Sequence, residues 1–188
     1  MKPPQATLET ARLLLRPFKV VDAPEVQRLA GDRAVADTTL HIPHPYRDGV
    51  AEEWIGTHQA LFDEGKGAHF AITLRSDGSL LGAITLMGMA PGHQAELGYW
   101  IGRPYWNQGY CTEAARAVLA YAFSDLGLIR VHACHIARNP ASGRVMQKSG
   151  MTREGCRRQH VRKGGQSEDV ELYGILKAEW NGTHPVGS

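Results

Sequence analysis

The stretch AELGYWIGRPYWNQGYCTEAARAVLAYAF, residues 95–123, decides the fold of this chain. Its beginning, residues 95–102, is an apolar run of strand length, and a turn that contains Gly109 follows it. Residues 112–126 then repeat apolar side chains at helical spacing, and Gly127 predicts where that helix ends. A strand that leads through a short turn into an amphipathic helix is typical of an α/β protein.

Hydrophobic periodicity outside this unit predicts further strands and helices of ordinary length. The expected strands are residues 12–18, 69–74, 80–87, 129–136 and 170–176, with one more near 153–161. The expected helices are 22–30, with Asp22 as N-cap and Pro24 in its first turn, 50–64, and a helix that Asn139 caps, Pro140 opens and Gly150 ends. The order β-α-α-β-β-β-α-β-α-β predicts a single mixed α/β sheet with helices on its faces.

The length and the composition fit one globular domain. The chain has 188 residues, 43% of them hydrophobic, which is enough to bury one sizeable core. We expect a single domain over residues 1–188, with its core at about 8–180 and loose ends at 1–6 and 181–188. The first residues lack the apolar segment and cleavage site of a signal peptide, and no apolar run approaches the roughly 18 residues that span a bilayer. The expectation is a cytoplasmic protein without a membrane partner.

The titratable residues give little ground for a metal or for a nucleic-acid partner. The three cysteines, Cys111, Cys134 and Cys156, form no CxxC pair, so reduced thiols are expected. None of the nine histidines lies in a metal-binding motif, which predicts that there is no metal site. The net charge of +2 is too small to indicate direct nucleic-acid recognition. The basic stretch 153–163 is compatible with a solvated hairpin or with a surface that guides an acidic partner.

The turn before the central helix is a candidate phosphate-binding loop. The first N–H groups of a helix have no partner within the helix, and the helix dipole makes that end positive. Here these amides belong to Gln108, Gly109, Tyr110, Cys111 and Thr112. Gly109 has no Cβ and would let a pyrophosphate approach closely. The loop has neither the GK[ST] nor the GxGxxG pattern, and an ordinary turn between strand and helix is the alternative.

Two motifs in a fixed order carry a resemblance to a known family. The segment ELGYWIGRPYWNQGYCTEAARAVLAYAFSDLGLIRVHA (96–133), followed by ARNPASGRVMQKSGMTREG (137–155), resembles the GNAT superfamily of acyl-CoA N-acyltransferases. It is most similar to the RimJ/RimL type, which acetylates the N-termini of ribosomal proteins. The segments TARLLLRPF (10–18), IPHPY (42–46) and VELYGILKAEW (170–180) also fit that subfamily.

The resemblance implies a fold, a reaction and an acyl donor. The fold is a single mixed, mostly antiparallel twisted sheet with helices on both faces, in which a central pair of parallel strands splays apart and admits the cofactor. The reaction is the acetylation of a primary amine by acetyl-CoA. Apart from the resemblance, no metal is expected, and the sequence leaves open whether the protein is a monomer or a homodimer. The implied acceptor is the α-amine of a protein N-terminus. The alternatives are a small amine, such as an antibiotic, a polyamine or an amino-acid derivative, and a non-catalytic acyl-CoA-binding module.

The same resemblance implies contacts with acetyl-CoA, residue by residue. The family's pyrophosphate loop, [QR]-x-x-G-x-[GA], matches residues 106–111 at its glycine, with tryptophan at the first position and cysteine at the last. The implied cofactor-binding residues are Trp100, Ile101 and Gly102 on the strand, Asn107, Gln108, Gly109, Tyr110, Cys111 and Thr112 at the loop, and Asn139, Ser142 and Arg144 on the next helix.

Catalysis needs a base for the amine and a hydrogen-bond donor for the departing thiolate. Many relatives in the family carry a tyrosine acid where this chain has Met146, so Ser142 is the implied donor. A helix-start serine that bonds only the backbone is the alternative. Glu96 is the expected base, because it is a single carboxylate on an otherwise apolar strand. The alternative for Glu96 is a strand-end residue that faces solvent or pairs with an arginine.

The acceptor site is expected on the first helices and on loop 40–49. The residues that the resemblance implies for its wall are His41, His44, Tyr46, Trp54 and His58. The two loop histidines are also second candidates for the base. Solvated histidines, and aromatic side chains that belong to the core, are the alternatives. His132 and His135, on the strand near the cofactor, are expected to pack or to form local hydrogen bonds.

Overall fold

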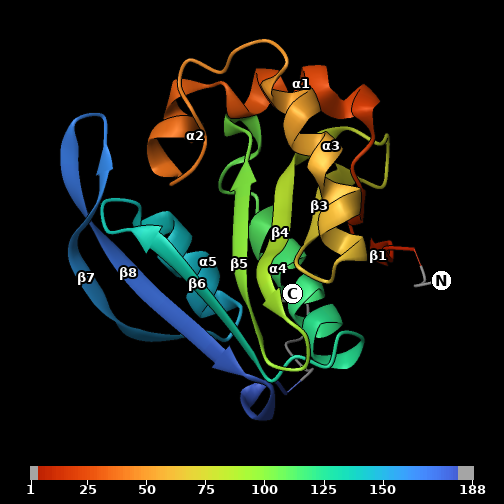
Figure 1. Ribbon diagram of the computed structural model, residues 1–188, viewed down its shortest axis with the longest axis vertical. Coiled ribbons are helices and arrows are strands. Elements are labelled where there is room, and N and C mark those ends of the chain that lie inside the picture. The colour runs from red at the N-terminus through yellow and green to blue at the C-terminus, as the bar shows by residue number, and fades with distance from the viewer. Residues whose placement is uncertain (1–3, 182–188) are drawn as a thin grey trace.

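The computed structural model describes residues 4–181, whose strands form one eight-stranded sheet in the order β1-β2-β3-β4-β5-β6-β8-β7 (Figure 1). The strands are β1 (Leu8–Glu9), β2 (Leu13–Pro17), β3 (Ala68–Leu74), β4 (Leu80–Ala90), β5 (Gln94–Ile101), β6 (Arg130–Ile136), β7 (Thr152–Lys163) and β8 (Gln166–Leu176). Neighbouring strands are antiparallel except β5 and β6, which run parallel. The expected mixed, mostly antiparallel sheet with one parallel pair is confirmed.

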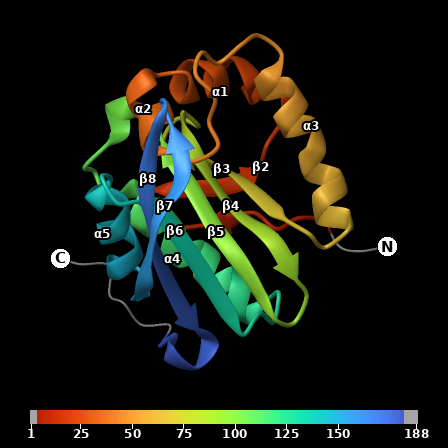
Figure 2. The ribbon, with the colours of Figure 1, turned by 60° about the vertical axis from the view of Figure 1, so that its left-hand side comes forward.

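Helices cover both faces of this sheet (Figure 2). They are α1 (Ala23–Ala30), α2 (Arg33–Thr38), α3 (Val50–Asp63), α4 (Tyr110–Ser124) and α5 (Pro140–Lys148). Since successive side chains of a strand point to opposite faces, Phe70 packs with Leu119 of α4 in the main core. Its neighbour Ala71 packs with Val26 of α1 and Ile55 of α3 in a second, smaller core. No helix within residues 4–181 has the length and apolar character needed to cross a membrane.

The predicted strands and helices all form, and the additional strand expected near 153–161 is part of β7. Sequence analysis missed α2 and β1, which span six and two residues and are too short for a periodic pattern. Part of the expected loose N-terminal end is held in place. Gln5 donates from Nε2 to the backbone oxygen of His69 at 2.8 Å, and Ala6 packs against the main core. The remainder of the expected loose ends, 1–3 and 182–188, lies outside the described residues.

Asp22 occupies the predicted N-cap position of α1, but its carboxylate makes no capping hydrogen bond. Instead it accepts two hydrogen bonds from the Arg16 guanidinium, both 2.8 Å long, and one from the backbone N–H of Lys19. Burial opposes the ionisation of Asp22, but these bonds outweigh it and hold the pKa of the carboxyl below its ordinary value. A bidentate charged pair is stronger than a single bond to a helix N–H, so the arginine takes the carboxylate.

The parallel pair β5 and β6 separates soon after it begins. Only Gln94, Ala95 and Glu96 pair with β6, opposite residues 130–132. Beyond Glu96, β5 continues along β4 as far as Ile101, whereas β6 continues along β8. Two strand edges therefore face each other across a gap in the middle of the sheet, which is the splay that the sequence resemblance implies.

Two stacked imidazoles are buried between α3 and β3. The rings of His58 and His69 are parallel within 8°, and their centroids are 4.1 Å apart. Both residues are buried, and neither nitrogen of His58 nor Nδ1 of His69 has a hydrogen-bond partner. Burial lowers the pKa of His58 to about 3 and that of His69 to about 4. Both rings are therefore neutral at pH 7.

This burial predicts a loss of stability in acid that is relieved by replacing His58. An unfolded histidine protonates near pH 6.5, while the folded pKa is depressed, so the free energy of unfolding must fall as the pH drops below 6.5. Between pH 7.5 and pH 5, we expect the free energy of unfolding of His58→Leu to fall by about 2 kcal/mol less than that of the parent. Urea unfolding at the two pH values measures this. The exposed His93→Gln should behave like the parent, and equal losses in His58→Leu would contradict the argument.

Candidate active site

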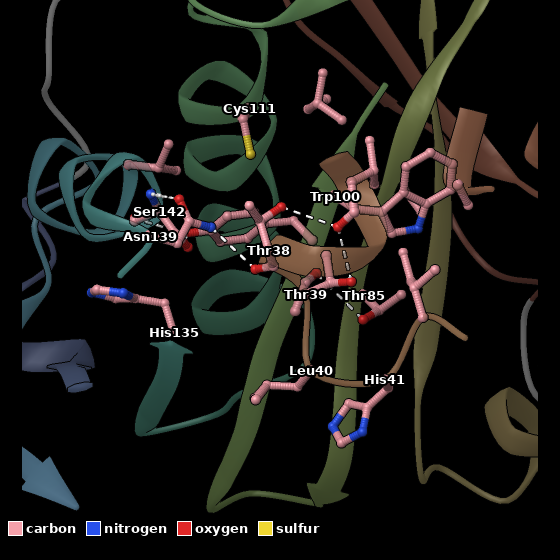
Figure 3. Close-up of a pocket in the computed structure, with 18 of the residues that line it drawn as sticks. Thr38, Thr39, Leu40, His41, Thr85, Trp100, Cys111, His135, Asn139 and Ser142 are labelled. Carbon is pink, nitrogen blue, oxygen red and sulfur yellow. Dashed lines mark hydrogen bonds between the residues drawn. The ribbon is translucent and has the colours of Figure 1, made fainter. Parts of the chain in front are cut away.

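A cavity of about 620 Å³ occupies the gap between β5 and β6. Its lining comes from α4 and α5 on one face of the sheet, and from α1, α3 and loop 40–49 on the other. Figure 3 shows Cys111, Asn139 and Ser142 toward one side of this cavity, and His41 and Thr85 toward the other. A cavity that reaches both faces allows two different molecules to meet between the strands.

The loop between β5 and α4 presents backbone amides to the cavity. Asn107 (φ 62°) and Gly109 (φ 80°) adopt the left-handed conformation, so the chain turns sharply before α4 begins at Tyr110. A Cβ at Gly109 would lie 3.5 Å from Nη2 of Arg12, an ordinary contact, so it is the backbone conformation that favours glycine. Residues 110–112 form the first turn of the helix and line the cavity. Their free N–H groups give this end of α4 the geometry that phosphate groups use.

Arg12, just before β2, braces this loop. Its guanidinium donates to Oε2 of Glu113 at 2.7 Å and to the carbonyl of Gln108 at 3.0 Å, and it lies 4.4 Å from the ring centroid of Tyr110. Thr10 donates to Oε1 of Glu113 at 2.6 Å. Burial opposes the ionisation of Glu113, but these hydrogen bonds outweigh it and hold its pKa below the ordinary value. Sequence analysis missed Arg12, because its partners lie 96 and 101 positions away along the chain.

Helix α5 brings an amide and two cations to the same cavity. Oδ1 of Asn139 accepts from the N–H of Ser142 at 3.4 Å, so the predicted N-cap is confirmed. Nδ2 of Asn139 donates to the carbonyl of Thr38 at 3.1 Å. Further along α5, Arg144 and Lys148 line the cavity. The positive end of α5 and these two cations favour an anionic ligand on this side of the sheet.

Tyr99 and Ser142 form a hydroxyl pair beside the gap. Oη of Tyr99 lies 2.9 Å from Oγ of Ser142 and donates to the Ser142 carbonyl at 3.0 Å, so the serine hydroxyl donates to the phenol in turn. Burial raises the pKa of Tyr99, which keeps the phenol protonated. Sequence analysis missed Tyr99, because strand alternation assigns it to the core side. A phenol in an apolar strand, which needs a polar partner, was the available signal.

Glu96 lies where β5 and β6 separate. Among the described residues that line the cavity, it is the one carboxylate. The thiol of Cys134 donates to Oε1 of Glu96 at 3.3 Å. Burial, helped by the charge of Glu96, raises the pKa of Cys134 to about 12, so the thiol stays protonated and serves as a donor. All three cysteines are free, as expected.

Three hydrogen bonds fasten segment 37–42, beside the cavity, to the second half of the chain. We name this set the entrance clasp. Its donors are the side chains of Arg138 (2.8 Å to the Asp37 carbonyl), Asn139 (3.1 Å to the Thr38 carbonyl) and Lys163 (3.1 Å to the Ile42 carbonyl). The clasp connects the end of α2 and the loop after it to residues that lie beyond the gap in the chain order of the sheet.

The cavity brings together most of the residues that sequence analysis singled out. Those that line it are Glu96, Trp100, Ile101, Asn107, Gly109, Tyr110, Cys111, Thr112, Asn139, Ser142, Arg144, His41, Tyr46 and Trp54. Its lining does not include Gly102, Gln108, His44 and His58. In residues 4–181, no group of three or more His, Cys, Asp or Glu is arranged to hold a metal ion.

The four predicted residues that do not line the cavity lie elsewhere in the structure. Gly102 packs so closely on Leu29 that a Cβ would lie 2.6 Å from its Cδ2 atom. The Gln108 amide donates within its own loop, and His44 is exposed on loop 40–49. His58 stacks on His69 inside the protein. The local hydrogen bond expected of the strand histidines is present at residue 135, whose Nδ1 lies 2.8 Å from the carbonyl of residue 136.

Comparison with known proteins identifies the family. The family described as acetyltransferase (GNAT) domain matches residues 12–152. The uncharacterized N-acetyltransferase YnaD of Bacillus subtilis is 34% identical over 177 residues, which are 93% of this chain and 99% of that protein. The putative ribosomal N-acetyltransferase YdaF of the same organism is 33% identical over 138 residues, 73% of this chain and 72% of that protein.

Solved structures agree with this assignment. A GNAT-family acetyltransferase from Bacillus anthracis superposes with a TM-score of 0.81 at 28% identity, covering 92% of this chain and 99% of that one. RimL, the ribosomal L7/L12 α-N-protein acetyltransferase solved with coenzyme A, shares the fold with a TM-score of 0.83 at 19% identity, covering 91% and 98%. The chain belongs to the GNAT acetyltransferase family and is an N-acetyltransferase.

Proposed function

We propose that the protein transfers the acetyl group of acetyl-CoA to the neutral α-amine at the N-terminus of a protein or peptide. One observation carries the proposal: a single cavity through the sheet joins a phosphate-type loop on one face to a lone carboxylate, Glu96. The fit to acetyl-CoA rests on residues of this chain. The amides of residues 110–112 and the cations of Arg144 and Lys148 suit its phosphates, and the unpaired edge of β5 suits the amides of its pantetheine arm. When bound, acetyl-CoA supplies the thioester from which the coenzyme A thiol departs.

Glu96 is the proposed base. It accepts the proton that the amine nitrogen loses as the new amide bond forms, and the Cys134 hydrogen bond holds its carboxylate in place. An α-amine has a pKa of about 8, so roughly a tenth of it is neutral at pH 7, whereas about one lysine amine in 2,500 is neutral. One carboxylate without a stronger base therefore matches an N-terminal amine better than a lysine.

Tyr99 and Ser142 are the proposed donors to the departing sulfur. Both side chains line the cavity, and burial raises the pKa of the Tyr99 phenol, so the phenol keeps its proton. To donate to the sulfur, a hydroxyl of this pair turns away from its present partner at Ser142 or Tyr99. Met146 is buried in the main core and does not line the cavity. The phenol of Tyr99 takes the place of the tyrosine that many relatives carry at the position of Met146.

A small monoamine is the second candidate acceptor. Relatives and structural neighbours differ in their acceptors: one relative is named a [ribosomal protein uS5]-alanine N-acetyltransferase, and one neighbour is a spermidine N-acetyltransferase chimera. The cavity favours a monoamine over a polyamine, because Glu96 alone among its described lining residues carries a negative charge. A polycation would bury further charges that have no partner.

Gly109→Val should raise the dissociation constant of acetyl-CoA at least about tenfold, because the branched side chain opposes the left-handed backbone and fills the space next to the loop amides. Isothermal titration calorimetry measures the constant. The matched control is Gly92→Val, which has the same kind of backbone conformation (φ 70°) in the turn before β5, outside the cavity. Equal affinities in both variants would rule out the loop as the phosphate site.

Thiol release from acetyl-CoA tests the proposed reaction. We expect release with peptides that have a free N-terminus, and little with the same peptides N-blocked and carrying a lysine, because the lysine amine is protonated. Release that is confined to polyamines or aminoglycosides would contradict the proposal.

The same assay on Glu96→Gln should show turnover at pH 7 reduced about 100-fold, with partial recovery at high pH, where more amine is already neutral. Cys134→Ser, which keeps a hydrogen-bond donor to Glu96, is the control. A pH–rate profile equal to that of the parent would remove Glu96 as the base.

Tyr99→Phe and Ser142→Ala should each lower kcat about tenfold or more, while the dissociation constant of acetyl-CoA changes by less than about threefold, since each removes a hydroxyl needed only as the thiolate leaves. Single-turnover kinetics and calorimetry separate the two effects. A change in affinity alone would make these residues binding groups.

A further inference from the structure

The half of the cavity next to α1 and α3 has an apolar wall. We define the acceptor wall as Ile42, Tyr46, Trp54, Met87 and Trp100, all of which line the cavity. Four of them, all except Met87, are partly buried and pack against the second core. The cations that line the cavity, Arg144 and Lys148, are on α5, and its carboxylate is Glu96, so no Lys, Arg, Asp or Glu among the described lining residues belongs to the wall.

Trp54 is held in a fixed orientation within this wall. Its ring meets Phe18 edge-on, with centroids 5.0 Å apart, and meets His58 at 4.4 Å and 89°. His58 in turn stacks on His69, which lines the cavity. These two imidazoles therefore support an aromatic surface without adding charge, since burial keeps both rings neutral. A rigid aromatic wall favours binding, because little side-chain freedom is lost when a ligand packs on it.

On the same face, Met87 packs against β5 at Gly98, two positions beyond Glu96. Gly98 shares this face with Glu96 and Trp100, and a Cβ there would lie 2.7 Å from Cε of Met87. Met87 thus fills the place where a larger side chain on β5 would lie. The acceptor wall therefore begins next to the Glu96 carboxylate. If an amine lies at Glu96, the side chain on the adjacent carbon points toward the apolar residues of the wall.

We propose that the acceptor carries an apolar side chain, aliphatic or aromatic, next to its α-amine, and that this side chain packs on the acceptor wall. The inference rests on the proposed function. An acidic first residue would bring a second negative charge near Glu96 and lose its hydration. A basic first residue would pair with Glu96 and occupy the base. In a hydrophobic pocket, one methylene more or less changes specificity about tenfold or more.

A peptide series tests this on the unmodified protein. The acceptors are X-Ala-Ala-Ala amides with glycine, leucine, phenylalanine, aspartate or arginine as X, compared by kcat/KM from thiol release at pH 8. We expect leucine and phenylalanine to exceed glycine at least about tenfold, and aspartate and arginine to fall below glycine. A flat series with thiol release would overturn the inference and leave the proposed function intact. No release from any peptide, with acetyl-CoA bound, would overturn both.

Variants of one helix connect the preference to the wall. Trp54→Ala should reduce the leucine-to-glycine ratio to within about threefold, with the affinity for acetyl-CoA unchanged. Phe62→Ala is the matched control, because it removes an aromatic side chain of α3 that packs against the main core and does not line the cavity. A ratio that persists in Trp54→Ala would overturn the assignment. A second outcome would also overturn the assignment. If the parent transferred butyryl groups faster than acetyl groups and Trp54→Ala lost this difference, the wall would hold the acyl chain and not the acceptor.

Discussion

The separation of β5 from β6 beyond Glu96 is the constraint on which the rest of this structure depends. Buried N–H and C=O groups without partners are costly, so two facing strand edges persist only where water or a ligand reaches them. Each strand is held from its other side, β5 by β4 and β6 by β8, which keeps the gap from closing. The cavity and the placement of Glu96 at the branching point follow from that single interruption.

Two helix starts complete the arrangement. Helix α4 begins at Tyr110 after a left-handed glycine, and α5 begins after the cap residue Asn139, and both starts line the cavity. Their dipoles add positive potential on the same face of the sheet as Arg144. Opposite them, the apolar acceptor wall lies beside Glu96, with His41, His69 and Thr85 among the polar groups of the lining. The sheet thus separates a side suited to anions from a side suited to apolar groups, with the carboxylate at the boundary.

The sequence predicted what local patterns encode and missed what long-range contacts create. The loop around Gly109, the carboxylate on β5 and the cap at Asn139 were predictable, because each depends on neighbours in the chain. Arg12 was not, since its partners are about 100 positions away, and the side chain of Tyr99 reaches the cavity because of the splay. Asp22 shows the converse, because it stands at the predicted N-cap position without capping the helix. A local capping rule applied to it, but Arg16 offered a stronger partner across the turn.

The entrance clasp has a consequence for how such a protein diversifies. Its three donors are side chains of the second half of the chain, but its three acceptors are backbone oxygens of segment 37–42. A backbone oxygen is present whatever residue occupies the position. Side chains of this segment can therefore change during evolution, and with them the shape of the entrance, while the segment stays fastened. Substitutions in 37–42 alter the cavity lining while these hydrogen bonds remain, whereas changes at Arg138, Asn139 or Lys163 remove the bonds that hold the segment.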